Sequence, residues 1–230
     1  MELAKLLNAM PGEVSQGLIW GLMAIGVYIT YKILDVADLT VDGSIATGGA
    51  VAAMLIIGGC NVWLAMLIAF LVGMLAGLVT GLLHTQMGIP AILSGILTQL
   101  ALYSINLRIM DNKANVALSV AKYPLVVSMR NARELALNNP IALLLLFTVV
   151  VIAVLYWFFG TEYGSTMRAT GANANMARAQ GINTNSRKVV GLMLSNGLVA
   201  LSGALLTQYQ GFSDVSMGRG AIVIGLAAVI

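Results

Sequence analysis

Apolar residues fill the chain in long runs, and polar residues gather in short stretches between these runs. No Asp, Glu, Lys or Arg occurs from Gly43 to Leu107. About 20 apolar residues suffice for a helix to cross a bilayer, and these runs lack the alternation typical of barrel strands. Because backbone groups in lipid must be hydrogen-bonded internally, we predict an all-α integral membrane protein, a polytopic helical bundle.

The apolar runs predict six to seven spans within a single transmembrane domain that covers residues 1–230. We place them at Gln16–Leu34, Gly43–Gly58, Val62–Leu83, Ile89–Leu107, Pro140–Phe159 and Val189–Tyr209, with a further run beginning near Gly220. The chain ends inside that last run, so we expect it to be a truncated piece of a longer membrane protein. Its first residues lack the basic start and the cleavage site of a signal peptide.

Composition supports the membrane assignment. Hydrophobic residues make up 59% of the chain and charged residues 9%, whereas soluble domains have about a quarter charged residues. The net charge of +3 comes from short loops, and we expect no nucleic-acid partner. Gly73, Gly77 and Gly81 form a stripe of small residues, which we interpret as a surface for close helix packing.

A shift of the chain by 176 residues aligns it with itself. Residues 21–24 fall on 197–200, and the Asp-Leu-Thr-Val of 38–41 falls on the Asp-Val-Ser-Met of 214–217. Five predicted spans separate the equivalent points, so the two units would be inverted relative to each other. We predict a first repeat over about 16–160 and an incomplete second repeat from about 189. Inverted repeats around a path through the membrane are typical of transporters.

Four polar residues in this repeat are candidates for a translocation path: Asp38, Thr40, Asp214 and Ser216. Each pair precedes a short, Gly-rich apolar segment, and short or broken helices at matching places often mark a path. An aspartate before a helix can instead cap its first N–H groups. The amide side chains within spans, Gln99, Asn106, Asn196 and Gln208, leave the same choice between a path and helix–helix hydrogen bonds.

Several kinds of chemistry have no sequence signal. The chain contains no G-x-x-x-x-G-K-[ST] and no G-x-S-x-G motif, and its single histidine has no partner at a metal-ligand spacing. We therefore expect no catalytic residue, no metal and no cofactor. Proton-coupled carriers usually hold a carboxylate or histidine within a span, and these spans contain few ionisable groups. An energy source in a partner protein is therefore favoured.

Two polar loops interrupt the spans. In loop 162–188, Asn173 and Gly181 are typical helix caps and enclose about two turns, too short to be stable without packing. In loop 108–139, runs 115–120 and 124–129 could pair as a hairpin, and a short helix could follow over 131–137. Loop 108–139 has five basic and two acidic residues and loop 162–188 has four and one, so charge does not determine the orientation.

The segment Met167–Asn183 resembles the cytoplasmic coupling segment of ABC importer permeases, in particular the branched-chain amino acid and simple-sugar permease family. Within that family it is similar to the branch associated with tryptophan- or tyrosine-type binding proteins. The segments G-L-M-A-I-G and D-L-T-V-D-G are similar to the family's first conserved span and following turn. Met176 departs from the family pattern, which often has Ala there. The matching residues are Arg168, Ala169, Gly171, Asn173, Ala177, Arg178, Gly181, Ile182 and Asn183.

This resemblance implies a multi-pass permease subunit of the bacterial inner membrane that moves a small polar solute. An amino acid is the first candidate for this solute. Such a subunit is not an enzyme, because a separate ABC ATPase hydrolyses ATP. The implied partners are a second permease copy, two ATPase subunits, an extracytoplasmic solute-binding protein and membrane lipid. The ATPase would dock on residues 166–183, through Arg168, Gly171, Asn173, Ala177, Arg178, Gly181 and Ile182. Loop 162–188 would then be cytoplasmic.

Three alternatives stay open at this point. A sugar or nucleoside permease of the same ABC class would share the coupling segment. An ion-coupled secondary transporter would also explain the inverted repeat, but it would need no ATPase. A purely structural membrane subunit would need no solute path near Thr40 and Ser216.

Overall fold

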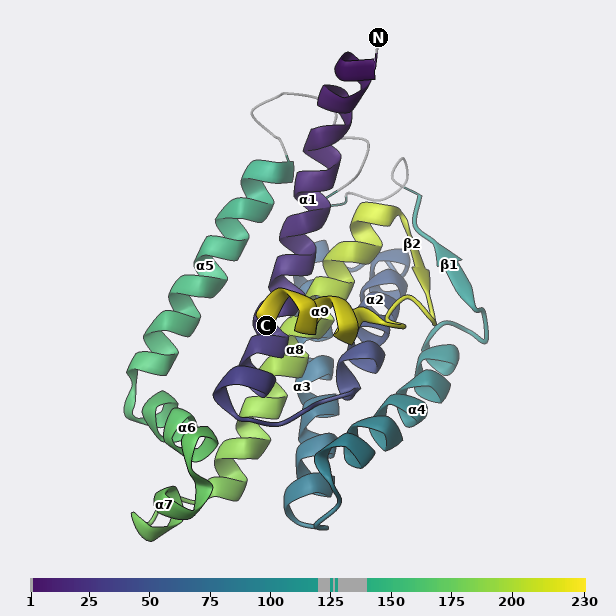
Figure 1. Cartoon of the computed structure of the whole chain (residues 1–230). Coiled ribbons are helices and arrows are strands. Elements are labelled where there is room, and N and C mark those ends of the chain that lie inside the picture. The colour runs from purple at the N-terminus through teal and green to yellow at the C-terminus, as the bar shows by residue number, and fades with distance from the viewer. Residues whose placement is uncertain (1, 120–124, 126, 128–139) are drawn as a thin grey trace.

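The computed structural model describes residues 2–119, 125, 127 and 140–230, and helices dominate them (Figure 1). The long helices are α1 (Glu2–Tyr28, continued by the π-helix η1, Ile29–Ile33), α2 (Thr40–Ile57), α3 (Val62–Thr85), α4 (Ala91–Ile109), α5 (Pro140–Gly160) and α8 (Thr184–Gln210). Six segments of the described residues are long and apolar enough to cross a membrane. The predicted all-α polytopic fold is confirmed, and the span boundaries agree within a few residues.

Helices α2 and α8 form the centre of the bundle. About 78% of the apolar window of each is buried, compared with 11% for α5. Helix α8 packs against α1, α2 and α3, and α4 packs on the outer side of α2 and α3. Helix α5 stands apart in Figure 1 and contacts mainly α1 and α6 (Glu162–Ala172). Most of its surface is therefore free to face lipid.

Glycine brings the central helices together. Gly73, Gly77 and Gly81 of α3 all lie against α8, where an added methyl group would collide with its backbone. The predicted packing role of this stripe is confirmed. A second crossing joins α2 to α8: Gly48 lies on the Ala200 carbonyl, and Gly203 lies on the Ile45 carbonyl. Such close backbone approach is typical of helices that associate in lipid.

Gly48→Ala should destabilise the protein, because the new methyl group would overlap the Ala200 carbonyl at the α2–α8 crossing. Overpacking of this kind costs about 1–3 kcal/mol. Gly21→Ala is the matched control, since nothing lies within 4 Å of its added methyl group. Thermal unfolding in detergent should show a lower midpoint for Gly48→Ala alone. Equal midpoints would contradict the close crossing.

A small sheet joins distant parts of the chain. Strand β1 (Asn115–Ala117) pairs antiparallel with β2 (Phe212–Asp214), with Val116 opposite Ser213. The first run of the predicted hairpin therefore forms a strand, but with a partner almost a hundred residues away. The second run, 124–129, and the predicted helix 131–137 lie almost entirely outside the described residues.

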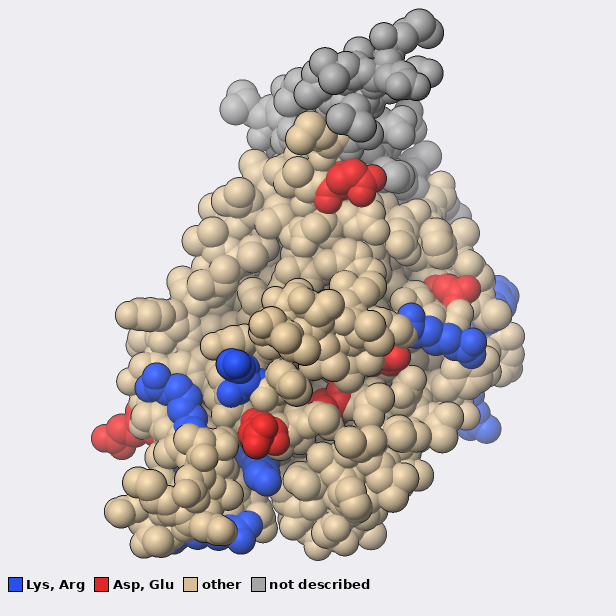
Figure 2. Space-filling model, in the orientation of Figure 1, with Lys and Arg blue, Asp and Glu red and all other residues tan. Residues whose placement is uncertain are grey.

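Two short elements follow the long helices. Helix α9 (Ala221–Val229) begins where the seventh apolar run was predicted, and it packs against α1 and α2. In Figure 1 it runs across the bundle, whereas α8 runs along it. Figure 2 shows a broad uncharged surface, with Lys, Arg, Asp and Glu gathered near α6 and around the turn after β2. The uncharged surface is suited to lipid contact.

Candidate functional site

The segment between α5 and α8 forms two helices at one end of the bundle (Figure 1). Thr161 caps the first, α6, by accepting a hydrogen bond from Gly164 N. The second, α7 (Ala174–Ala179), forms the tip of this end. The sequence predicted α7 but treated α6 as loop, because α6 is polar and short.

The predicted caps of α7 are confirmed. The Asn173 side chain accepts hydrogen bonds from the backbone N–H groups of Asn175 (3.1 Å) and Met176 (3.0 Å). Gly181 has a φ of +80°, and Ile182 N donates to Ala177 O at 3.0 Å, which closes the C-terminal turn. Ala177 is buried, so α7 sits firmly on the turn that follows it.

The exposed face of α7 carries the side chains that a partner could contact. Met176 is 63% exposed, and Arg178 is exposed as well. Arg178 Nε donates to Thr184 Oγ1 at 2.8 Å, which ties α7 to the first residue of α8. Its terminal nitrogens make no hydrogen bond within the described residues. The guanidinium is thus held in place and still has free donors.

The C-terminal end of α6 contacts the end of α1. Gly171 lies on the Ile33 carbonyl of η1, so closely that no Cβ would fit. Met167 is buried in a cluster with Leu34, Val36 and Leu192. Arg168, in contrast, is exposed and lines an open pocket beside η1. The α6–α7 segment therefore contacts both α8 and the end of α1.

A chain of buried polar side chains links four elements in the centre of the bundle. Asp38 accepts from Thr40 N (2.9 Å) and from Asn196 Nδ2 (2.6 Å). Ser44 Oγ donates to Asn196 Oδ1 at 2.6 Å. The hydroxyl of Thr40 lies 2.8 Å from that of Thr80, which donates to Thr98. This network therefore connects α2, α3, α4 and α8 through the residues before α2.

These contacts decide what Asp38 and Thr40 do locally. Both are buried, and Asp38 accepts from the N–H two residues later, as a capping aspartate does. Asn196 is likewise a helix–helix hydrogen-bond residue, which is one of the two interpretations left open above. A path role for Asp38 and Thr40 stays a prediction.

The second Asp-hydroxyl pair makes the same local bond in a different environment. Asp214 accepts from the backbone N and the hydroxyl of Ser216, but this turn is partly exposed. The two turns also touch. Asp42 accepts from Gly220 N (3.0 Å) and Ile222 N (2.9 Å) and so caps α9, while Gly218 lies on the Asp42 carbonyl. The start of α2 thus holds the start of α9.

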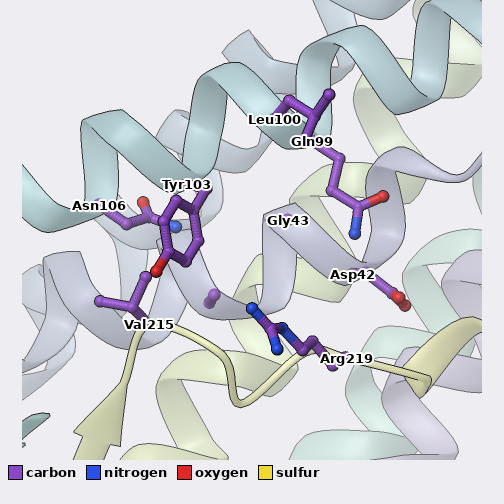
Figure 3. A pocket seen from close by; sticks show the side chains of 9 residues that line it. Asp42, Gly43, Gln99, Leu100, Tyr103, Asn106, Val215 and Arg219 are labelled. Carbon is purple, nitrogen blue, oxygen red and sulfur yellow. The ribbon is translucent and has the colours of Figure 1, made fainter. Parts of the chain in front are cut away.

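A cavity of about 350 Å³ lies between α4, the start of α2 and the turn after β2 (Figure 3). Its size is at the small end of the range for ligand pockets. The predicted path residues border it without lining it: Asp42 follows Thr40 by two residues, and Val215 separates Asp214 from Ser216. The lining residues are Asp42, Gly43, Ala46, Gln99, Leu100, Tyr103, Asn106, Val215 and Arg219.

The described residues contain six helices of membrane-spanning length, a helix pair tied to two of them, and a cavity lined by both polar and apolar side chains. These are features of a polytopic membrane transport protein. Comparison with known proteins gives the family. Residues 13–230 match the model described as "Branched-chain amino acid transport system / permease component". The chain belongs to this family of ABC permeases, and the family resemblance inferred from the sequence is confirmed.

Individual relatives agree with this assignment. The "Tyrosine transport system permease protein" of Clostridioides difficile (strain R20291) is 45% identical over 94% of this chain and 70% of its own length. The "Uncharacterized protein RP368" of Rickettsia prowazekii (strain Madrid E) is 33% identical over 97% and 76%. The "Nucleoside ABC transporter permease protein NupC" of Lactococcus lactis subsp. cremoris (strain MG1363) is 36% identical over 36% and 27%. No solved structure matches.

Sequence reasoning missed three side chains of the cavity that carry a polar or charged group, those of Asp42, Tyr103 and Arg219. Asp42 stands next to the Asp38 turn and has no sequence signal of its own, and Arg219 lies in a turn that has no regular pattern of polar and apolar residues. Tyr103 reads as an ordinary aromatic residue of a span. Gln99 and Asn106 did carry a signal, since amide side chains are unusual within apolar helices. Only the fold shows that these two face a cavity.

Proposed function

We propose that this permease imports an amino acid across the bacterial inner membrane, driven by a separate ABC ATPase subunit. Residues 166–183 are the ATPase docking segment, so loop 162–188 is cytoplasmic. The intact permease works as a dimer and receives its solute from an extracytoplasmic solute-binding protein. The permease itself performs no covalent chemistry. The observation that carries the proposal is the exposed, doubly capped α7, fixed to α8 in a member of an ABC permease family.

The construction of α7 suits a docking element. A helix of six residues has little stability of its own and is here held by caps at both ends. Its exposed Met176 offers apolar contact area, and Arg178 offers donors for a carboxylate on the partner. Because α6 also rests on Ile33, a displacement of this segment would act on α1 and α8 together.

The amino-acid substrate is supported by the relative from Clostridioides difficile. That protein is named as a tyrosine transport permease and aligns with almost the whole chain. The relative named for nucleosides aligns with about a third of it. A nucleoside or sugar permease is therefore the second candidate, and an ion-coupled carrier is the third.

Uptake into proteoliposomes separates these candidates. The intact permease, its ATPase and its binding protein should accumulate radiolabelled L-tyrosine only when ATP is present, and ionophores should leave uptake unchanged. Competition by leucine, ribose and adenosine then ranks the solute classes. Uptake that needs an ion gradient and no ATPase would favour a secondary carrier and overturn the proposal.

Arg178→Glu and Met176→Asp should each remove most of the ATPase from the purified permease. The first substitution reverses a charge, and the second places a carboxylate at an exposed apolar contact; each should weaken binding about tenfold or more. Co-purification and ATP-dependent uptake measure both effects.

Lys113→Glu is the control, because it makes the same charge reversal as Arg178→Glu at an exposed residue of loop 108–139, on the other side of the membrane in the proposed orientation. If Lys113→Glu releases the ATPase and the two α7 variants do not, the docking assignment and the orientation are both wrong.

A further inference from the structure

The cavity beside α4 brings polar side chains together from three separate elements. Gln99 and Tyr103 reach it from α4, and Arg219 reaches it from the turn between β2 and α9. Figure 3 shows the Gln99 amide and the Arg219 guanidinium directed toward the same space from opposite sides. Asp42, at the start of α2, completes this wall. No single helix could provide this arrangement.

Asn106 is the residue that points most directly to a ligand. It is 1% exposed, and neither its amide nitrogen nor its amide oxygen has a hydrogen-bond partner within the described residues. Figure 3 shows its amide beside the Tyr103 ring at the edge of the cavity. A buried amide without partners costs free energy, which a native protein normally avoids. A polar group of a ligand at this edge of the cavity, which Asn106 lines, would give the amide a partner.

The charged groups around the cavity are of both signs. Arg219 is exposed, and its guanidinium makes no ion pair within the described part of the chain. The Asp42 carboxylate is fixed by the N–H groups of Gly220 and Ile222, and each oxygen retains a further lone pair. Because Gly218 rests on the Asp42 carbonyl, the turn that carries Arg219 is held against the start of α2. The two charges therefore have fixed backbone positions.

The remaining walls are apolar. Ala46, Leu100 and Val215 line the cavity together with the ring of Tyr103. A volume of about 350 Å³ accommodates one small molecule. A sugar or nucleoside would match the amides but would leave the two charges without an opposite charge. A free amino acid carries a carboxylate, an ammonium group and a side chain that an apolar wall can contact.

We propose that this cavity binds a free α-amino acid with a large apolar or aromatic side chain, held as a zwitterion. Arg219 pairs with the carboxylate, and Asp42 accepts from the ammonium group. Asn106 bonds to the polar end of the ligand, and Tyr103 packs on its side chain. This assignment rests on the proposed function, because it names where the transported amino acid is held within the membrane domain.

Ligand binding can be measured without the ATPase, by saturation-transfer NMR on the intact permease in nanodiscs. L-Phenylalanine is the probe, and phenethylamine and 3-phenylpropionate are its analogues without the carboxylate and without the amine. We expect L-phenylalanine to give a signal and either analogue to give a signal at least about tenfold weaker, since each analogue leaves one charge of the cavity unpaired. Equal signals from all three would overturn the zwitterion site.

Asn106→Leu tests the site by a substitution of similar shape. If no ligand contacts Asn106, the Asn106→Leu variant should bind L-phenylalanine like the wild type and unfold at the same temperature or higher. We expect unchanged or higher thermal stability together with about tenfold weaker binding and L-tyrosine uptake. Arg219→Gln should weaken both by a similar factor, and Arg108→Gln, at an exposed arginine of α4 outside the cavity lining, should weaken neither.

The two proposals fail in different ways. Normal binding of L-phenylalanine by both Asn106→Leu and Arg219→Gln would overturn the cavity assignment, whatever uptake shows. Binding that depends on both residues, combined with uptake that needs no ATPase, would overturn the proposed function and leave the cavity as the amino-acid site. The NMR measurement therefore decides on the cavity independently of the energy source.

Discussion

Replacing Asn196 by leucine is expected to destabilise the permease severely. The Asn196 amide donates to Asp38 Oδ2 and to Leu192 O, and it accepts from Ser44 Oγ. All these groups are buried at the centre of the bundle. Leucine would fill the space but would leave the Asp38 oxygen and the Ser44 hydroxyl without this partner. A buried donor or acceptor left without its partner costs about 1–3 kcal/mol, so the loss at both groups comes to roughly 3 kcal/mol or more.

The unfolding midpoint in detergent should therefore fall by roughly 6–12 °C, if about 2–4 °C corresponds to 1 kcal/mol in a chain of this length. Asn106→Leu is the matched control, because it makes the same change at a second buried asparagine that has no partner within the described residues. The same substitution should thus lower stability at 196 and preserve it at 106. Equal midpoints for both variants would show that the network contributes little to stability.

A double-mutant cycle isolates the bond between Asp38 and Asn196. Asp38→Leu alone leaves the Asn196 amide without its 2.6 Å acceptor. In the double variant Asp38→Leu/Asn196→Leu, neither group of this pair remains, so its stability should be higher than the sum of the two single effects predicts. Additive effects would indicate that the two side chains act independently.

Membrane spans are the part of this fold that hydropathy determines. Each predicted run forms a helix, and six helices of the described residues are long and apolar enough to cross a membrane. The caps of α7 were equally predictable, since Asn173 and Gly181 act through local hydrogen bonds and backbone conformation. The partner of β1 was not predictable, because strand pairing across almost a hundred residues has no local signal.

The candidate site shows the same difference between local contacts, which the sequence predicts, and tertiary contacts, which it does not. Asp38 and Asp214 have matching sequences and make matching local bonds, yet one is buried in a network and the other lies in a partly exposed turn. A sequence motif predicts the hydrogen bonds within its own turn, whereas tertiary packing determines which residues surround that turn. Asn196 and Asn106 illustrate this most clearly: both are amides within apolar helices, and only the fold assigns one to a network and the other to a cavity.

Contacts continue from the proposed docking segment to the buried network. Gly171 of α6 rests on Ile33, and the next residue, Leu34, packs against Met167 and Leu192. The chain then runs to Asp38, which bonds to Asn196 of α8. Every second residue of this stretch is buried, namely Leu34, Val36 and Asp38, so we expect the stretch to move with the helices that it packs against. Gly171 is therefore the position where a change should most affect coupling.

Gly171→Ala should uncouple ATP hydrolysis from transport. The added methyl group would overlap the Ile33 carbonyl, so α6 would have to withdraw from the end of α1. Exposed α7 keeps its own caps and its bond from Arg178 to Thr184, so the ATPase should still bind. We expect complex formation and ATP hydrolysis near wild-type levels, with L-tyrosine uptake reduced about tenfold or more, as for a small misplacement of catalytic or coupling parts.

Gly160→Ala is the matched control. It adds the same methyl group at the last residue of α5, just before α6 begins, where nothing lies within 4 Å. It should preserve binding, hydrolysis and uptake. If Gly171→Ala instead lowers all three in parallel with the unfolding midpoint, the contact with Ile33 only stabilises the fold. If it lowers none of them, α6 does not transmit motion to α1, and the connection between ATPase and membrane helices runs through α8 alone.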